Sequence, residues 1–289
     1  MELIYETGLG RLFQADCIDL MKSLASDSVD TFFADPPFNL DKKYGPESSD
    51  NLSTTQYLGW SENWLKEAVR TLSPGGALFL YNLPKWLMPL GTFLMGQPKM
   101  TFKHWIAVEK AHSLPIANRL STSHYGMLYF IKGDRPRHFD RGAVRIPIKV
   151  CRHCGKDIKD YGGHKKYLNE KGLNLGDVWT DVPPVRHRKY KYRGANELAP
   201  VLLERVIRLT TKPGDLICDP FAGGGTSAYV AEKNGRSWIS GDIGNCEPAK
   251  MRLTDLANGC DPDWKSSDKR FVHTCTPSEN FRLVFSPGS

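Results

Sequence analysis

A glycine-rich turn near residue 225 constrains the fold of this chain more than any other sequence feature. It follows a short apolar run at 215–218, which we predict as a buried strand, and it precedes a predicted helix over 228–234. Glycines at such a turn let the backbone pass close to a ligand at the carboxyl edge of a parallel sheet. Asp242 lies in the next predicted strand, 237–243, where a carboxylate can accept hydrogen bonds from ribose hydroxyls. The pattern predicts a nucleotide-like ligand on an open α/β sheet.

The rest of the chain repeats this alternation of strands and helices. Buried apolar runs predict strands at 29–34, 77–82 and 127–131, and apolar residues at helical spacing predict helices at 55–72 and 198–209. Proline–glycine pairs, Pro74-Gly75-Gly76 and Pro213-Gly214, are predicted to end these helices. Strands that alternate with helices indicate a mostly parallel, doubly wound sheet with right-handed crossovers.

A second turn, Asp35-Pro36-Pro37-Phe38, directly follows the predicted strand at 29–34. The prolines fix the backbone and cannot continue a regular element. The carboxylate and the proline carbonyl are hydrogen-bond acceptors, and the phenylalanine offers a flat apolar face. Together they suit a planar ring that carries an exocyclic amino group. The alternative is an ordinary Pro-Pro strand terminator.

The middle of the chain is basic. Residues 131–195 contain 17 Lys and Arg against 7 Asp and Glu, whereas the remainder contains 22 against 25. This distribution is typical of an inserted segment that binds a polyanion, and a solvated lysine-rich surface is the alternative. Cations interleave with Tyr190 and Tyr192 near its end, and these are the candidate nucleic-acid contacts: Arg186, Arg188, Lys189, Lys191 and Arg193.

The same segment contains Cys151 and Cys154, whose spacing is that of half a zinc site. His153 and His164 lie nearby, but the sequence has no second Cys-x-x-Cys. We therefore favour a reduced thiol pair in a turn and keep zinc as the lesser alternative.

Two other groups of residues are assigned structural roles. His124 begins a predicted strand, and we expect it to be structural although it could reach a bound base. The aromatic stripe of Tyr57, Trp60 and Trp64 lies at helical spacing, which is more often core than a ligand site.

Composition excludes several classes of protein. A hydrophobic content of 40% supports a packed core and excludes wholesale disorder. No apolar run approaches the roughly 20 residues of a membrane-spanning helix, and the first residues lack the features of a secretion signal. Seven scattered cysteines then indicate reduced thiols, and we expect a cytoplasmic protein without a membrane partner.

The two turns together resemble the amino-group DNA methyltransferases, which use S-adenosylmethionine. Further stretches share the resemblance, namely QADCIDLM, LSPGGALFLYN, SHYGMLYFIKG and the region from Asn196 into the glycine turn. The order of tetrad, basic insertion and glycine turn is similar to the beta class of that family. The resemblance implies a Rossmann-like, S-adenosylmethionine-dependent methyltransferase fold with an inserted target-recognition region. The corresponding segments are a catalytic half at 1–131, the insertion at 132–194, a cofactor half at 195–259 and a tail at 260–289.

The resemblance also implies roles for residues at the matching positions. The catalytic tetrad is Asp35, Pro36, Pro37 and Phe38. The cofactor site comprises Asp16, Asp35, Asn196, Asp219, Phe221, Gly223, Gly225, Thr226, Ser227 and Asp242. One departure is that Asp242 stands where the family more often has Glu, which puts its reach to both ribose hydroxyls in doubt.

The implied reaction is methyl transfer to an exocyclic amino group of double-stranded DNA. The Asp that begins the tetrad favours adenine N6, by analogy, and cytosine N4 is the alternative. Because the amino group is unreachable inside a duplex, we expect the base to be flipped onto Phe38. The resemblance also allows a cognate restriction endonuclease and a homodimer as partners.

Three rival functions are considered. The spacing Gly223-x-Gly225-x-x-Ala228 fits an NAD-dependent oxidoreductase. However, only 64 residues follow Gly225, and the tetrad at Asp35 is left unexplained. The others are a catalytically silent DNA-binding protein, which the intact motifs disfavour, and methylation of RNA or of a protein glutamine. The glutamine enzymes usually begin the tetrad with Asn.

Overall fold

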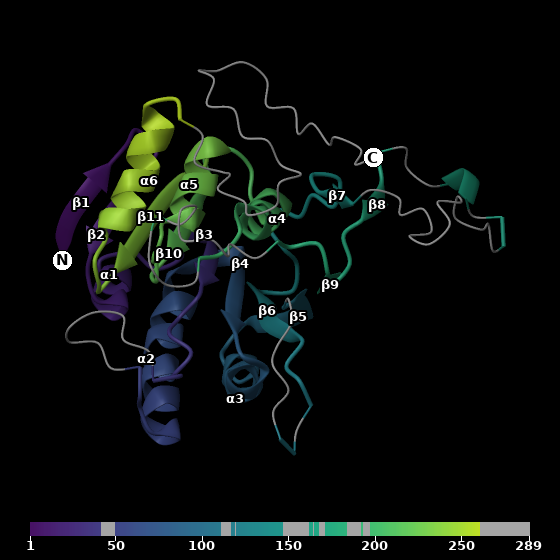
Figure 1. Ribbon diagram of the computed structural model, residues 1–289, viewed down its shortest axis with the longest axis horizontal. Coiled ribbons are helices and arrows are strands. Elements are labelled where there is room, and N and C mark those ends of the chain that lie inside the picture. Colours follow the sequence, from purple (N-terminus) through teal and green to yellow (C-terminus); the bar gives the residue numbers. More distant parts are fainter. Residues whose placement is uncertain are drawn as a thin grey trace.

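The computed structural model describes residues 1–41, 50–110, 117–118, 120–146, 162–163, 165–167, 171–183, 192 and 197–260. In these ranges it forms a nine-stranded sheet in the order β1-β2-β11-β10-β3-β4-β6-β5-β9 (Figure 1). The strands are β1 (Glu2–Glu6), β2 (Gly10–Gln14), β3 (Val29–Ala34), β4 (Leu72–Asn82), β5 (Met100–Glu109), β6 (His124–Lys132), β9 (Val178–Trp179), β10 (Leu216–Asp219) and β11 (Ser237–Asp242). The helices are α1 (Cys17–Lys22), α2 (Thr54–Thr71), α3 (Pro84–Met95), α4 (Pro200–Thr210), α5 (Thr226–Lys233) and α6 (Glu247–Ala257).

The centre of the sheet is parallel. Strands β2, β11, β10, β3 and β4 pair in parallel, and β1, β6 and β5 add antiparallel pairings. Successive residues of a strand point to opposite faces, so Phe32 packs into one core cluster and Phe33 into the other. Since both faces are covered, the central strands are apolar along most of their length, as a parallel sheet requires.

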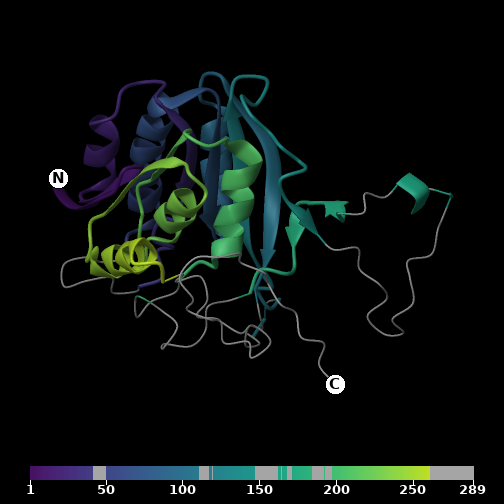
Figure 2. The same cartoon turned by 90° about the horizontal axis from the view of Figure 1, so that it is seen from above.

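The helices divide between the two faces of the sheet. Helices α1, α2 and α3 contribute to one cluster, which includes Met21, Trp64 and Leu90. Helices α4, α5 and α6 contribute to the other, which includes Val206 and Val230. Figure 2 shows the purple α1 and the blue α2 grouped together, apart from the green and yellow α4, α5 and α6. The doubly wound arrangement that the sequence predicts is confirmed.

Helix α2 begins with a capping box, in which Ser53 accepts from the Gln56 N–H and the Gln56 side chain accepts from the Ser53 N–H. It ends at Thr71, one residue earlier than predicted. Pro74-Gly75-Gly76 does not form the helix terminus, because these residues already lie inside β4. Gly75 has a positive φ of 76° there, and the pairing of β3 with β4 shifts register at this point.

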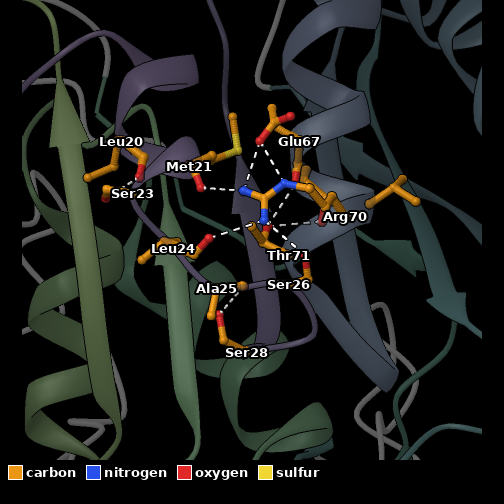
Figure 3. A network of polar contacts seen from close by, with 12 residues as sticks. Leu20, Met21, Ser23, Leu24, Ala25, Ser26, Ser28, Glu67, Arg70 and Thr71 are labelled. Carbon is orange, nitrogen blue, oxygen red and sulfur yellow. Dashed lines mark hydrogen bonds and ion pairs between the residues drawn. The ribbon is translucent and has the colours of Figure 1, made fainter.

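Arg70, in the last turn of α2, holds the end of α1 (Figure 3). Its guanidinium donates to the carbonyls of Met21 and Leu24 at 2.9 and 3.1 Å, and to the Ser26 hydroxyl at 3.1 Å. Glu67, one turn earlier, pairs with the same guanidinium at 2.8 Å. The network fixes the turn from which β3 departs, and β3 leads directly into the Asp-Pro-Pro-Phe tetrad.

The basic segment, predicted as an insertion, contains short elements where it is described. These are β7 (Arg145–Ile146), a 3-10 turn at Lys165–Tyr167 and β8 (Leu173–Asn174), with β7 and β8 paired antiparallel. Strand β9 pairs in parallel with β5, so part of the basic segment extends the main sheet. Residues 261–289 lie outside the described ranges, and among the described helices none is long and apolar enough to cross a membrane.

Candidate active site

The two motif turns lie at one edge of the sheet. Strands β3 and β10 are parallel neighbours, with Phe32 opposite Cys218. Each strand therefore ends at the same side, and Asp35 follows β3 while Phe221 follows β10. The sequence-based expectation that chain folding brings these distant segments together is confirmed.

Hydrogen bonds from neighbouring elements fix the carbonyls of the tetrad. The Tyr57 hydroxyl of α2 donates to the Pro37 carbonyl at 2.7 Å, and the Trp86 indole N–H of α3 donates to the Phe38 carbonyl at 2.8 Å. The amide of Asn82, at the end of β4, donates to the Tyr57 oxygen at 2.9 Å. These three side chains are buried, so the bonds are shielded from water.

The carbonyl of Pro36 differs from those of its two successors. Among the described residues no hydrogen bond is formed to it, whereas the next two carbonyls are each held by a side chain. A fixed turn thus keeps an acceptor next to the Asp35 carboxylate, as recognition of an amino group requires.

The chain just beyond the tetrad is held by Asp50, whose side chain is buried. Its two carboxylate oxygens accept from the N–H groups of Asn39 and Leu40 at 2.6 and 3.0 Å. Asn39 and Leu52 exchange a pair of hydrogen bonds, both at 2.7 Å. The backbone of Phe38 is therefore held in place by hydrogen bonds to the residues that precede and follow it.

The Phe38 ring packs against two tyrosines. Its centroid lies 6.1 Å from that of Tyr81 and 5.8 Å from that of Tyr125, and the two tyrosines are 5.5 Å apart. Burial, together with the nearby charge of Asp35, raises the pKa of both tyrosines. Both hydroxyls thus remain protonated at neutral pH. The three rings form an apolar wall beside the Asp35 carboxylate.

The glycine turn has an internal acceptor, Asp219. It accepts from the Phe221 N–H at 2.9 Å and from the Ser227 hydroxyl. Burial, with a smaller contribution from the charge of Asp242, raises the pKa of Asp219 to about 7, although both hydrogen bonds oppose the rise. Asp219 and Ser227, both predicted at the cofactor site, are buried and bonded to each other, so here they shape the turn.

Asp242, at the end of β11, is the carboxylate that faces the turn from outside. One of its oxygens accepts from the Gly223 N–H and the other from the Gly244 N–H, both at 2.8 Å. A carboxylate oxygen has a second lone pair, so each can accept another hydrogen bond. Asp242 is half-buried and positioned for a ligand over the turn.

Gly225 is required for a packing reason as well as a conformational one. Its φ is 71°, and a Cβ there would lie 2.7 Å from the Cβ of Ala249 on α6. The sequence predicts that the glycines admit a ligand, but at this position the space is taken by a helix of the same chain.

Asp16 lies at the same sheet edge, beyond Asp242. Strand β2 ends at Gln14 opposite Asp242, and Asp16 caps α1 by accepting from the Ile18 N–H at 2.8 Å. Its neighbour Ala15 donates to the Asp242 carbonyl at 3.0 Å. The structure thus brings Asp16, Asp242 and the glycine turn together.

Thr226 belongs to a buried network behind the turn. Arg252 of α6 donates to its hydroxyl at 2.6 Å and pairs with Glu197 at 2.8 Å. The same Glu197 accepts from the Tyr192 N–H at 2.7 Å. The Arg252 guanidinium also lies 4.8 Å from the Tyr192 ring centroid. The turn, α6 and Tyr192 therefore share one polar cluster.

Phe221, in the turn, contacts α2. Its ring lies edge-on to Trp60 and Trp64, with centroids 5.9 and 5.2 Å apart. Tyr57 of the same helix holds the tetrad, so the aromatic stripe assigned only to the core contacts both motifs. Its helical spacing was visible in the sequence, but these partners were not.

Several predicted residues lie outside the described ranges. These are Asn196, the cysteines Cys151 and Cys154, and the basic residues Arg186, Arg188, Lys189, Lys191 and Arg193. In the part of the chain that the structure describes, no cluster of three or more His, Cys, Asp or Glu could hold a metal. The zinc alternative and the DNA contacts therefore stay predictions.

Comparisons with known proteins agree with this geometry. The N6_N4_Mtase model, a DNA methylase family, matches residues 29–248. Type II methyltransferase M.BamHI of Bacillus amyloliquefaciens is 48% identical over 249 residues, which make up 86% of this chain and 58% of that protein. M.HpaI of Haemophilus parainfluenzae is 30% identical over 253 residues, covering 87% and 76%. The chain thus spans less than two thirds of M.BamHI.

Solved structures show the same fold. PvuII DNA methyltransferase, named as cytosine-N4-specific, superposes with a TM-score of 0.64 at 18% identity and covers 91% of this chain and 96% of its own. The complex of M1.HpyAVI with SAM gives 0.54 at 19% identity, covering 85% and 100%. The predicted fold class is confirmed. Given the match over most of its length, the chain belongs to the N6/N4 DNA methylase family.

Proposed function

We propose that this chain transfers a methyl group from S-adenosylmethionine to an exocyclic amino group of a base in double-stranded DNA. The observation that carries the proposal is the shared edge at which Asp35 follows β3 and Phe221 follows β10. A methyl donor at one turn would meet an amino group at the other. Family membership supports DNA as the substrate.

The residues around the glycine turn fit the proposed cofactor. Asp242 retains acceptor capacity for ribose hydroxyls, and Asp16 lies beyond it on the side proposed for the adenine. Phe221 adds a partly buried apolar surface. The cofactor supplies an electrophilic methyl group on a sulfonium. The relative M1.HpyAVI was solved with SAM, which supports the same assignment here.

The tetrad supplies recognition and orientation of the amino group. The Asp35 carboxylate and the Pro36 carbonyl accept its two hydrogens, which favours a tetrahedral nitrogen whose lone pair is available for in-line transfer. The Phe38 ring, backed by Tyr81 and Tyr125, provides the surface for the flipped base. No covalent enzyme intermediate is needed.

We propose cytosine N4 as the target atom, with adenine N6 as the alternative. The choice is supported by the PvuII enzyme, which shares the fold of this chain and is named as cytosine-N4-specific. The adenine alternative is supported by Asp35 at the start of the tetrad, which favours adenine by analogy. Both amines have delocalised lone pairs and need the same acceptors, so the tetrad chemistry serves either base.

The basic residues between 186 and 193 are proposed to contact DNA phosphates. Each neutralised phosphate releases counterions, so the affinity for DNA should fall steeply as salt rises. The two curated relatives named above are type II methyltransferases, and we propose the same setting here, with a restriction endonuclease as the partner. A homodimer and a cytoplasmic location complete the proposal.

Sequencing of DNA from a host that expresses this chain, by a single-molecule method sensitive to modified bases, tests the proposal. It should show a modified cytosine within one short recurring sequence. Modified adenine would instead show that the alternative, adenine N6, is the target atom. Unmodified DNA, with the folded protein present, would contradict the function itself.

A further inference from the structure

Helix α2 carries three aromatic residues on one face. Tyr57, Trp60 and Trp64 follow one another at intervals of one helical turn, and neighbouring rings lie 5.8 and 6.3 Å apart. Tyr57 and Trp64 are fully buried, and Trp60 is half-buried. The stripe contacts two segments that are about 180 residues apart in the sequence.

At its N-terminal end the stripe holds the tetrad. The Tyr57 hydroxyl donates to the Pro37 carbonyl and accepts from the Asn82 amide. The Tyr57 ring also packs on Trp86 at 4.5 Å, and Trp86 in turn donates to the Phe38 carbonyl. One hydroxyl therefore links the tetrad to the end of β4.

One turn further along, the stripe holds the glycine turn. The rings of Trp60 and Trp64 both form T-shaped contacts with the Phe221 ring. Phe221 is the first residue after Asp219-Pro220, so its position sets where the turn begins.

We propose that Tyr57 and Trp60 are positioning residues that together set the separation between the target amino group and the methyl donor. The inference rests on the proposed function, because it assigns the tetrad to the amine and the glycine turn to the cofactor. Adjacent helical turns form a rigid spacer, with a rise of about 4.5 Å over three residues. Methyl transfer needs reacting atoms about 3–3.5 Å apart, and a misplacement of about 1 Å can reduce the rate about 100-fold.

The assignment predicts that two substitutions one helical turn apart affect different quantities, the rate of methyl transfer in one case and the cofactor affinity in the other. Tyr57→Phe keeps the ring but removes the hydrogen bond to the tetrad. The single-turnover rate of methyl transfer should fall about tenfold or more, with the Kd for S-adenosylmethionine unchanged within about twofold. Trp60→Leu removes the edge contact with Phe221 and should raise that Kd about tenfold.

Tyr5→Phe is the matched control. It removes a hydroxyl from a half-buried tyrosine on β1, at the far edge of the sheet, and should change neither quantity. Tyr57→Phe also leaves the Asn82 amide without its acceptor, so the melting temperature is measured alongside. If that variant does not fold, Trp86→Phe tests the neighbouring carbonyl and should show the same loss of rate with unchanged cofactor affinity.

The outcomes separate this inference from the proposed function. Wild-type protein that methylates DNA, with Tyr57→Phe and Trp86→Phe equally fast, would overturn the positioning role alone. So would equal changes of rate and Kd in both the Tyr57 and Trp60 variants, because general destabilisation gives no split between them. Wild-type protein that transfers no methyl group would instead contradict the proposed function.

Discussion

Glu197 and Arg252 form a buried ion pair behind the glycine turn, with 2.8 Å between Oε2 and Nη2. Their side chains are 0% and 5% exposed. Arg252 also donates to Thr226, and Glu197 accepts from Tyr192. The pair therefore connects α6, the glycine turn and Tyr192, and its loss should lower the stability of the packing behind the turn.

Glu197→Gln should destabilise the protein by about 3–5 kcal/mol, because it removes the carboxylate that pairs with the buried Arg252 guanidinium. Urea unfolding of the two proteins measures the difference. Glu6→Gln is the control, since it breaks the exposed pair with Arg11 and should cost no more than about 1 kcal/mol. Equal stability of Glu197→Gln and the wild type would contradict a structural role for the pair.

The pKa of Asp219 predicts a pH dependence of stability. Because burial raises this pKa from 3.8 to about 7, the folded chain keeps a proton that the unfolded chain releases. The contribution of that proton is fully present below about pH 4 and is lost as the pH rises to about 7. Asp219→Asn mimics the protonated form and does not titrate, so its stability relative to the wild type should increase over this window. Chemical unfolding at several pH values measures the difference, and a constant difference would refute the raised pKa.

Two glycines with similar positive φ angles give a matched comparison of packing. Gly225 and Gly235 have φ angles of 71° and 68°, but a Cβ would meet Ala249 only at the first, with nothing within 4 Å at the second. Gly235→Ala should cost about 1–2 kcal/mol of conformational strain. Gly225→Ala should cost an additional 1–3 kcal/mol or so for the overlap.

The Ala249→Gly background relieves part of the overlap, because it removes the Cβ at 2.7 Å but leaves the Cα of residue 249 at 2.9 Å. In that background Gly225→Ala should cost less than in the wild type but still more than Gly235→Ala. Thermal unfolding reports each value. If Gly225→Ala is no worse than Gly235→Ala in the wild-type background, the close contact with α6 does not limit this position.

Asp35→Ala should still bind S-adenosylmethionine and lose at least about 100-fold in methyl transfer, because one acceptor of the amino group is gone. Titration calorimetry gives the affinity and a single-turnover assay gives the rate. Asp41, a few residues further along, supplies a control, and Asp41→Asn, which removes its charge but suits its φ of 58°, should keep the wild-type rate. Full activity of Asp35→Ala would exclude the carboxylate from the mechanism.

The elements that sequence predicted best are those whose pattern is local and buried. Strand β3 was predicted at its observed bounds, and α2, β10 and β11 within a residue or so at most ends, since continuous apolar runs and helical stripes are strong signals. Helix α3 was missed because Pro89 and Gly91, inside it, disfavour a helix, yet its buried leucines pack on the sheet. Tertiary packing outweighs propensity there.

The N-terminal hairpin was missed for a different reason. Strands β1 and β2 are five residues each and mostly exposed or half-exposed, so their apolar pattern is weak. The short α1 gave no periodic signal, although Asp16 caps it. These elements exist because β2 pairs with β11, which is a contact between residues far apart in the sequence.

The candidate site likewise has a part that the sequence predicts and a part that it does not. Its two turns are contiguous motifs, and Asp35 and Asp242 could be named from the sequence. The supports of the turns come from other elements, and nothing local marks Asn82 or Trp86 as partners of the tetrad. Tyr57 was visible only as a member of an apolar stripe, because its hydroxyl partner depends on the packing of α2 against the edge of the sheet.

The central claim is that the two turns form one site for methyl transfer to an amino nitrogen. The purified chain, incubated with DNA and S-adenosylmethionine carrying an isotopically labelled methyl group, tests this directly when the DNA is digested to nucleosides and analysed by mass spectrometry. The claim predicts labelled N4-methyldeoxycytidine, or labelled N6-methyldeoxyadenosine if adenine is the target, and neither in the Asp35→Ala reaction. Label on a ring carbon, or no label in any nucleoside from the wild-type reaction, would contradict it.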